Sequence, residues 1–178
     1  MKLVRIFEHA KLYAIHYPHE ELDEYHRLLE LWNDAEYLLK FFETHEKDLS
    51  FFKTNPNYAA KTTFTLAARL EEDVQIASIS DSGNVGGSLQ VLFKPLYNNE
   101  ASVDVEHQRT KAKEKWLRMY AIRIAANCFV ISGGAIKLTQ QMAEREHTAN
   151  ELHKIERTKD YLIDEGLFDE NDFDILEL

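Results

Sequence analysis

The stretch from Trp116 to Thr139, WLRMYAIRIAANCFVISGGAIKLT, constrains the fold most strongly. Its β-branched and aromatic residues are concentrated in two arms, over about 116–124 and about 128–132, a pattern typical of paired strands. Asn127, between the arms, tolerates the positive φ that short hairpin turns often require. Gly133 and Gly134 are expected to end the second arm. The sequence therefore predicts a central β-hairpin.

The rest of the chain shows mainly helical spacing. Apolar residues recur at helical intervals from Leu22 to Trp32, and further helices are expected over about 58–79 and over Glu151–Glu165, the last ending at Gly166. One or two strands are expected between Leu3 and Tyr17. Five aromatic residues that follow the first helix are expected in the core: Tyr37, Phe41, Phe42, Phe51 and Phe52.

Together these elements predict an α+β fold, in which a small antiparallel sheet with its central hairpin at about 116–132 packs against helices. The 178 residues suit a single domain, 1–178. Its expected parts are a helix-rich region over about 18–80, a loop at 78–88, a sheet and C-terminal helix region over 89–166, and an acidic tail over 167–178. Apolar residues in the tail predict that it docks on its own domain or on another subunit.

The sequence favours a cytoplasmic protein that does not enter a membrane. No apolar run approaches the roughly 20 residues that span a bilayer. Charged residues interrupt the N-terminal segment, so no signal peptide is expected. Cys128 is the only cysteine and therefore forms no intramolecular disulfide, which fits a reducing compartment.

Charge is segregated along the chain. The net charge of −10 repels phosphate, so nucleic-acid binding would need a local basic patch. The segment 109–123 provides one, with six basic residues against the single acid Glu114. Alternation along a strand places Arg118 and Tyr120 on one face and Arg123 on the other. Lys111, Lys113, Lys115 and Tyr120 are thus candidate RNA-binding residues, although a solvated edge strand blunted by charges would show the same pattern.

A second group of candidates follows the hairpin. Attack of a ribose 2′-hydroxyl on its own phosphate needs a base, an acid and cations. Arg118, Lys137 and Arg145 are candidate cations, and His147 or a tyrosine is a candidate proton carrier. An ordinary polar connection is the alternative. Glu144 and His147 have the spacing of a helical metal-ligand pair, but Asp23 and His26 make a poor second pair for such a site, and no metal or cofactor is expected.

The segments LRMYAIRIAANCFVISGGAIKLTQQM, EREHT and ELHKIERTKDYL carry a family resemblance. Their order is an Arg- and Tyr-bearing strand, a short turn, an apolar strand, a glycine followed by Lys-x-Thr, and a Glu/Lys-rich helix. Over about Trp116–Leu162 the chain resembles the C-terminal half of the RelE/ParE toxin superfamily, most nearly its phage-derived HigB-like branch.

The resemblance implies a small antiparallel sheet with helices packed on one side, ribosome-dependent endoribonuclease cleavage of messenger RNA, and an antitoxin as partner. It implies catalytic roles for Arg118 and Lys137, and further roles for Arg145 and His147. The sequence is also compatible with a different class of function, one without catalysis. A non-catalytic interaction module or inactive relative would act through a partner or as a homo-oligomer, using apolar helical faces.

Overall fold

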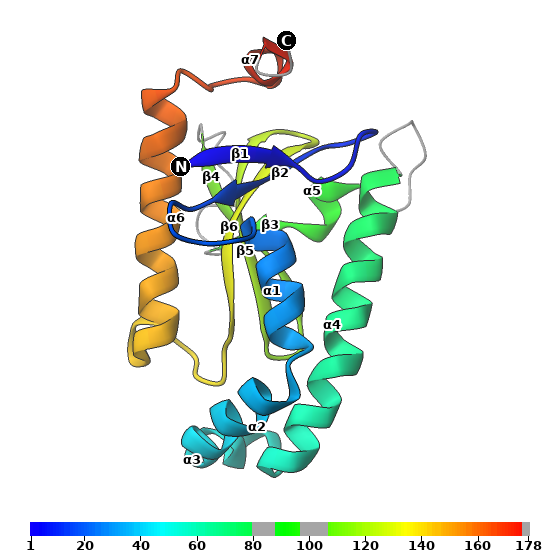
Figure 1. The fold of residues 1–178 in the computed structure, drawn as a ribbon, viewed down its shortest axis with the longest axis vertical. Helices are drawn as coiled ribbons and strands as arrows, with labels where there is room; N and C mark the ends of the chain where they lie inside the picture. The colour runs from blue at the N-terminus through cyan, green and yellow to red at the C-terminus, as the bar shows by residue number, and fades with distance from the viewer. Residues whose placement is uncertain (80–87, 97–106, 176–178) are drawn as a thin grey trace.

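In a computed structural model, the chain forms a six-stranded sheet flanked by helices (Figure 1). The structure describes residues 1–79, 88–96 and 107–175. The strands are β1 (Lys2–Arg5), β2 (Lys11–His16), β3 (Lys94–Pro95), β4 (Gln108–Glu114), β5 (Leu117–Ala125) and β6 (Cys128–Ile136). Their order in the sheet is β1-β2-β6-β5-β4-β3. Neighbours are antiparallel except for β2 and β6, which run parallel. The fold is α+β, as the sequence predicts.

Helices cover both faces of the sheet. They are α1 (Glu24–Trp32), α2 (Ala35–Thr44), α3 (Glu46–Leu49), α4 (Pro56–Ile79), α5 (Leu89–Leu92), α6 (Glu146–Asp164) and α7 (Glu170–Ile175), with short 3-10 turns at Ser50–Phe52 and Met142–Glu144. Residues of α1, α2 and α4 form one hydrophobic cluster with Met119 and Ile131, whereas residues of α6 and α7 form another with Tyr120 and Val130. The sheet therefore lies between two apolar layers, with α4 and α6 on opposite sides (Figure 1). Among the described residues, no helix has the length and apolar character needed to cross a bilayer.

The predicted hairpin is confirmed as β5 and β6, but its second arm is longer than expected. Gly133 and Gly134 lie inside β6 and do not end it. At Gly134 a Cβ would lie 2.6 Å from the carbonyl oxygen of Arg118 and 2.7 Å from Cδ1 of Leu28. The glycine is therefore explained by the close approach of α1 to the strand.

The strand β4 is a feature that the sequence analysis missed. It pairs antiparallel with β5, placing Lys113 opposite Arg118 and Lys111 opposite Tyr120. Its buried positions include the small residues Thr110 and Ala112, so the segment lacks the apolar alternation by which a strand is recognised.

The remaining elements largely follow the predictions. Both N-terminal strands and the three long helices are present, although α6 begins earlier than expected, at Glu146. It ends at Asp164, just before the predicted capping residue Gly166, whose φ is 73°. The predicted loop at 78–88 lies mostly outside the described residues. The tail docks on its own domain, because Leu167 and Phe173 are buried and the Phe173 ring lies 4.8 Å from that of Tyr13.

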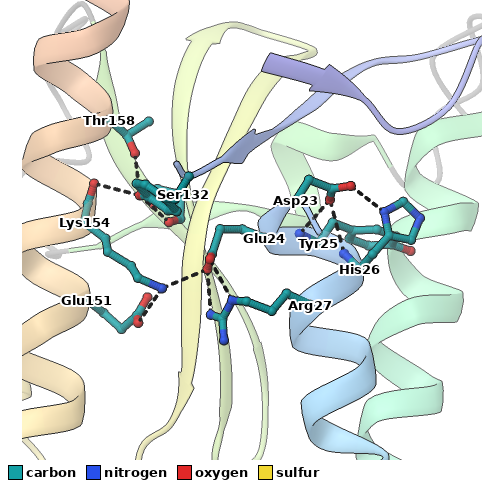
Figure 2. A network of polar contacts seen from close by, with 10 residues as sticks. Asp23, Glu24, Tyr25, His26, Arg27, Ser132, Glu151, Lys154 and Thr158 are labelled. Atoms are coloured by element: carbon teal, nitrogen blue, oxygen red, sulfur yellow. Dashed lines mark hydrogen bonds and ion pairs between the residues drawn. The ribbon is translucent and has the colours of Figure 1, made fainter. Parts of the chain in front are cut away.

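A buried network of charges joins α1 to α6 around one edge of β6 (Figure 2). The side chain of Glu24, the first residue of α1, has no exposed surface. Its carboxylate accepts two hydrogen bonds from Arg27, at 2.7 and 2.8 Å, and one from Nζ of Lys154 at 3.1 Å. Lys154 also lies 3.5 Å from Oε1 of Glu151. Two helices on opposite faces of the sheet are thus connected by one carboxylate.

This network lies where β6 loses its strand partner β2. The pairing of β2 with β6 extends only to Ile131. At the next residue, the carbonyl of Ser132 accepts a hydrogen bond from the Tyr17 hydroxyl, at 2.9 Å. Beyond it, a Cβ at Gly133 would lie only 2.1 Å from Oε2 of Glu151, so the glycine makes room for that carboxyl.

Glu151 is the member of the network whose carboxyl is only partly satisfied. Its Oε2 is buried and has no hydrogen-bond partner among the described residues. Burial raises the pKa of its carboxyl to about 7, with the charge of Glu24 adding to the rise and Lys154 and Arg27 opposing it.

We expect the free energy of unfolding to depend on pH through the protonation of Glu151. Its folded-state pKa of about 7 lies above the ordinary 4.5, so the folded protein binds this proton more tightly than the unfolded chain does. The contribution of Glu151 to stability therefore falls as the pH rises from about 4.5 through about 7. Glu151→Gln removes the titration, so its free energy of unfolding relative to wild type is expected to rise over that window. Urea unfolding across this pH range measures the change. Glu72→Gln, on the exposed surface of α4, is the control, and a constant difference for both variants would contradict the prediction.

Gly134→Ala is expected to lower the free energy of unfolding by about 1–3 kcal/mol, the usual cost of overpacking a filled interior. The added methyl group would meet a backbone carbonyl and the packed side chain of Leu28, neither of which can move away cheaply. Urea denaturation at neutral pH measures the effect. A loss within about 0.5 kcal/mol, as for ordinary surface changes, would show that α1 moves freely over β6.

Candidate functional site

A basic cleft lies at the end of the sheet where β4 turns into β5. It consists of a narrower cavity of about 470 Å³ and an open one of about 800 Å³, which share Lys113, Arg118, Lys137, Gln140 and Gln141. Seven basic residues line the two cavities: Lys47, Lys111, Lys113, Lys115, Arg118, Lys137 and Arg145. The acidic residues among the lining are Asp48 and Glu144. A chain with a net charge of −10 thus has a strongly positive cleft.

Strand pairing brings the central cations of the cleft together. Lys113 is paired with Arg118 across β4 and β5, and Ala135 of β6 is paired with Arg118 on its other side. Lys111 and Tyr120, the next pair on the same face, extend the row. Lys137 follows β6 directly, and its backbone N–H donates to the carbonyl of Trp116 at 2.7 Å. Strands β4 and β5 and the residue that follows β6 therefore bring four cations to the narrower cavity.

Three of these cations, Lys111, Arg118 and Lys137, contact carbonyl oxygens. Nη1 of Arg118 donates to the carbonyls of Lys115 and Leu117, at 2.6 and 2.7 Å. Nζ of Lys137 donates to the carbonyls of Thr139 and Gln140, and Nζ of Lys111 to that of Leu96 at 2.7 Å. In the described part of the chain, no carboxylate forms a salt bridge with Lys111, Lys113, Arg118 or Lys137.

The positive charges of the cleft repel one another, and burial together with this repulsion lowers the pKa values of Lys111 and Lys137. Burial lowers the pKa of Lys137, and the charges of Arg118 and Lys111 lower it further. Burial likewise lowers the pKa of Lys111, with added effects of Arg118 and Lys113. The pKa of Arg118 is lowered by burial as well. A bound anion would relieve this repulsion, which makes the cleft suited to phosphate groups.

Arg145 lines the open cavity, but its guanidinium is already paired with a carboxylate. Its Nε and Nη2 donate to the two carboxylate oxygens of Asp48, at 2.8 and 2.6 Å. This bidentate contact lowers the pKa of Asp48. Arg145 therefore links the start of α6 to α3 at the rim of the cleft.

His147 is not among the residues that line the cleft. Its Nε2 donates to the carbonyl of Ile136 at 2.9 Å, and its ring packs 5.1 Å from that of Phe41 and 4.9 Å from that of His45. Of the four predicted catalytic residues, Arg118 and Lys137 line the same cavity, and Arg145 lies at the rim of the cleft. The fourth, His147, packs against Phe41 of α2.

The predicted RNA-binding residues all line the cleft. Lys111 and Tyr120 line the narrower cavity, Lys115 lines the open one, and Lys113 lines both. Lys115, with φ of 49°, lies in the tight turn between β4 and β5, and its Nζ is 4.2 Å from the Trp116 ring centroid. Arg123, which alternation placed on the opposite face, is not part of the lining.

Phe51 is a lining residue that the sequence analysis assigned wrongly. The prediction of a core position holds for Phe42 and, in partly buried form, for Tyr37, Phe41 and Phe52, but 77% of Phe51 is exposed. Two adjacent phenylalanines in a short turn point in different directions, and nothing in the sequence distinguishes which is buried. Lys47, Gln140 and Gln141 are further lining residues without a sequence signal.

No metal site accompanies the cleft in the part of the chain that the structure describes. No group of three or more histidine, cysteine, aspartate or glutamate side chains is arranged to hold an ion there. Glu144 and His147, whose spacing is that of a helical ligand pair, make separate contacts: Glu144 accepts from the backbone N–H of Gln141, and His147 donates to the carbonyl of Ile136.

Comparison of the chain with protein-family models, with curated proteins and with solved structures finds no match.

Proposed function

We propose that the basic cleft binds the sugar-phosphate backbone of RNA, and that the chain is a RelE/HigB-like toxin or a toxin-derived protein. The observation that carries the proposal is the convergence of Lys111, Lys113, Arg118 and Lys137, without salt-bridged carboxylates in the described chain, in a protein of net charge −10. Clustered cations of this kind are the electrostatic footprint of a nucleic-acid site. The sequence resemblance over about Trp116–Leu162 supports the family and implies an antitoxin as partner.

The same residues support cleavage as the proposed reaction. A ribose 2′-hydroxyl that attacks the adjacent phosphate must lose a proton, while negative charge grows on the phosphate oxygens. Lys137 has a lowered pKa, as a lysine base requires, and Arg118 lies in the same cavity as a guanidinium suited to phosphate. Tyr120 also lines this cavity, but its side chain is fully buried, so solvent water is the proposed proton donor to the leaving oxygen.

The position of His147 favours a second candidate, a relative that keeps the binding cleft without the reaction. The ring is held by Ile136 and by packing against Phe41 and His45, so the histidine expected to carry protons does not line the cleft. Such a protein would act by occupying RNA or by binding a partner in the same cleft. The two candidates share the binding step and differ in whether the RNA is cut.

Arg118→Ala is expected to weaken binding of a short single-stranded RNA roughly tenfold or more, because a hydrogen bond to a charged group contributes about 1.5–3 kcal/mol. The slope of log affinity against log salt should fall by about 0.7, the contribution of one phosphate contact on a single strand. Fluorescence anisotropy between about 50 and 200 mM salt measures both quantities. Lys61→Ala, which removes a charge from the exposed surface of α4, is the matched control. Equal losses in the two variants would show that binding follows net charge and not this cleft.

Lys137→Ala is expected to slow cleavage by about 10²–10⁴-fold if Lys137 transfers the proton, the usual contribution of a general base. Induced expression of the wild-type chain should then arrest growth and shorten message lifetimes, whereas the variant should not. Growth curves and message decay measure the effect, again with Lys61→Ala as control. Unchanged growth and decay with the wild-type chain, alongside RNA binding by the purified protein, would favour the non-catalytic candidate.

A further inference from the structure

Phe51 is a large apolar side chain that the fold leaves exposed. It lies in the 3-10 turn Ser50–Phe52, with 77% of its surface accessible. Its ring is nearly perpendicular to that of Phe52, at a centroid distance of 5.3 Å, so only part of it is covered. Phe51 lines the open cavity of the basic cleft together with Lys113, Lys115 and Arg118.

The turn that carries Phe51 is anchored to the basic strands. The Phe52 ring lies 5.4 Å from that of Trp116, in the turn between β4 and β5. The Trp116 indole N–H donates to the hydroxyl of Thr63 on α4, at 3.0 Å, and both residues are buried. The turn that carries the exposed ring is therefore held beside the cations of β4 and β5. An exposed aromatic face beside cations is the arrangement on which single-stranded nucleic acids stack their bases.

The narrower cavity has a different lining. Its apolar lining residues are Leu96, Tyr120, Met142, Ala143 and Leu152, and its amides come from Gln140 and Gln141. A volume of about 470 Å³ lies within the roughly 300–1,000 Å³ of pockets that hold small molecules. Apolar walls with a few hydrogen-bonding groups suit a planar nucleobase, because its faces are apolar and its edges are polar.

The two cavities share their central cations. Lys113, Arg118 and Lys137 line both of them, so a phosphate bound there would have the narrower cavity on one side and Phe51 on the other. This order of base pocket, cations and aromatic face matches the order of base, phosphate and base along a single strand.

We infer that the cleft takes an unpaired dinucleotide segment, with one base in the narrower cavity, the linking phosphate on Lys113, Arg118 and Lys137, and the neighbouring base stacked on Phe51. The inference rests on the proposed function and specifies its substrate class as single-stranded RNA. Duplex RNA does not fit, because its bases are paired and stacked inside the helix, so that none is free to enter the narrower cavity or to stack on Phe51.

Phe51→Ala in the full-length protein tests this inference. The probes are a labelled single-stranded RNA of mixed sequence and an RNA duplex with the same number of phosphates, both measured by fluorescence anisotropy at low salt. The variant is expected to bind the single strand at least about fivefold more weakly, the lower end for loss of one stacked base, and to bind the duplex as wild type does. Phe168→Ala is the matched control, because Phe168 is 46% exposed and outside the cleft lining. Circular dichroism confirms that both variants fold.

The outcomes separate this inference from the proposed function. Selective loss of single-strand binding in Phe51→Ala, with Phe168→Ala unchanged, supports the dinucleotide site. If the wild-type protein binds the single strand but Phe51→Ala binds equally well, the stacking site is overturned while the RNA-binding cleft stands. Equal wild-type affinity for duplex and single strand would also overturn it. If the wild-type protein binds neither RNA even at low salt, the proposed function itself fails.

Discussion

The arrangement of the fold depends on one buried carboxylate. Glu24 begins α1 on one face of the sheet, and its partners include Lys154 of α6 on the other face. Removing one member of a buried ion pair typically costs about 3–5 kcal/mol, because the remaining charge loses its compensation. Both helices are therefore held at the edge of β6 where β2 no longer pairs, and Gly133 leaves the space that this requires.

The basic cleft follows from the same framework. α6 fixes the end of the segment that connects it to β6, and that segment carries Lys137 and the cleft glutamines. Strand pairing then holds like charges together, and their backbone partners leave the positive charge uncompensated by carboxylates of the described chain. The contrast with Arg145 is informative, because the fold supplies Asp48 for that arginine. An external anion is the natural counter-charge for Arg118 and Lys137.

Local patterns predicted the elements well where side chains repeat at a regular interval. The β-branched arms of the hairpin and the helical stripe of α1 have that property, and both are present. β4 does not, because Thr110 and Ala112 are too small to mark a buried face. The glycine pair by itself predicts a strand end, but the close approach of Leu28 and Glu151 explains it. These contacts are made between residues far apart in the sequence, so a local sequence pattern does not predict them.

The sequence by itself determined the fold class, the segregation of charge and the common face of Arg118 and Tyr120, because alternation along a strand depends only on local geometry. Only the tertiary structure decided which candidates meet. It joined Lys111 and Lys113 to Arg118 through the pairing of β4 with β5, directed His147 away from the cleft, and exposed Phe51 beside the cations. The physical reason is that these relations depend on strand pairing and on the packing of distant helices, which the spacing of residues along one segment does not encode.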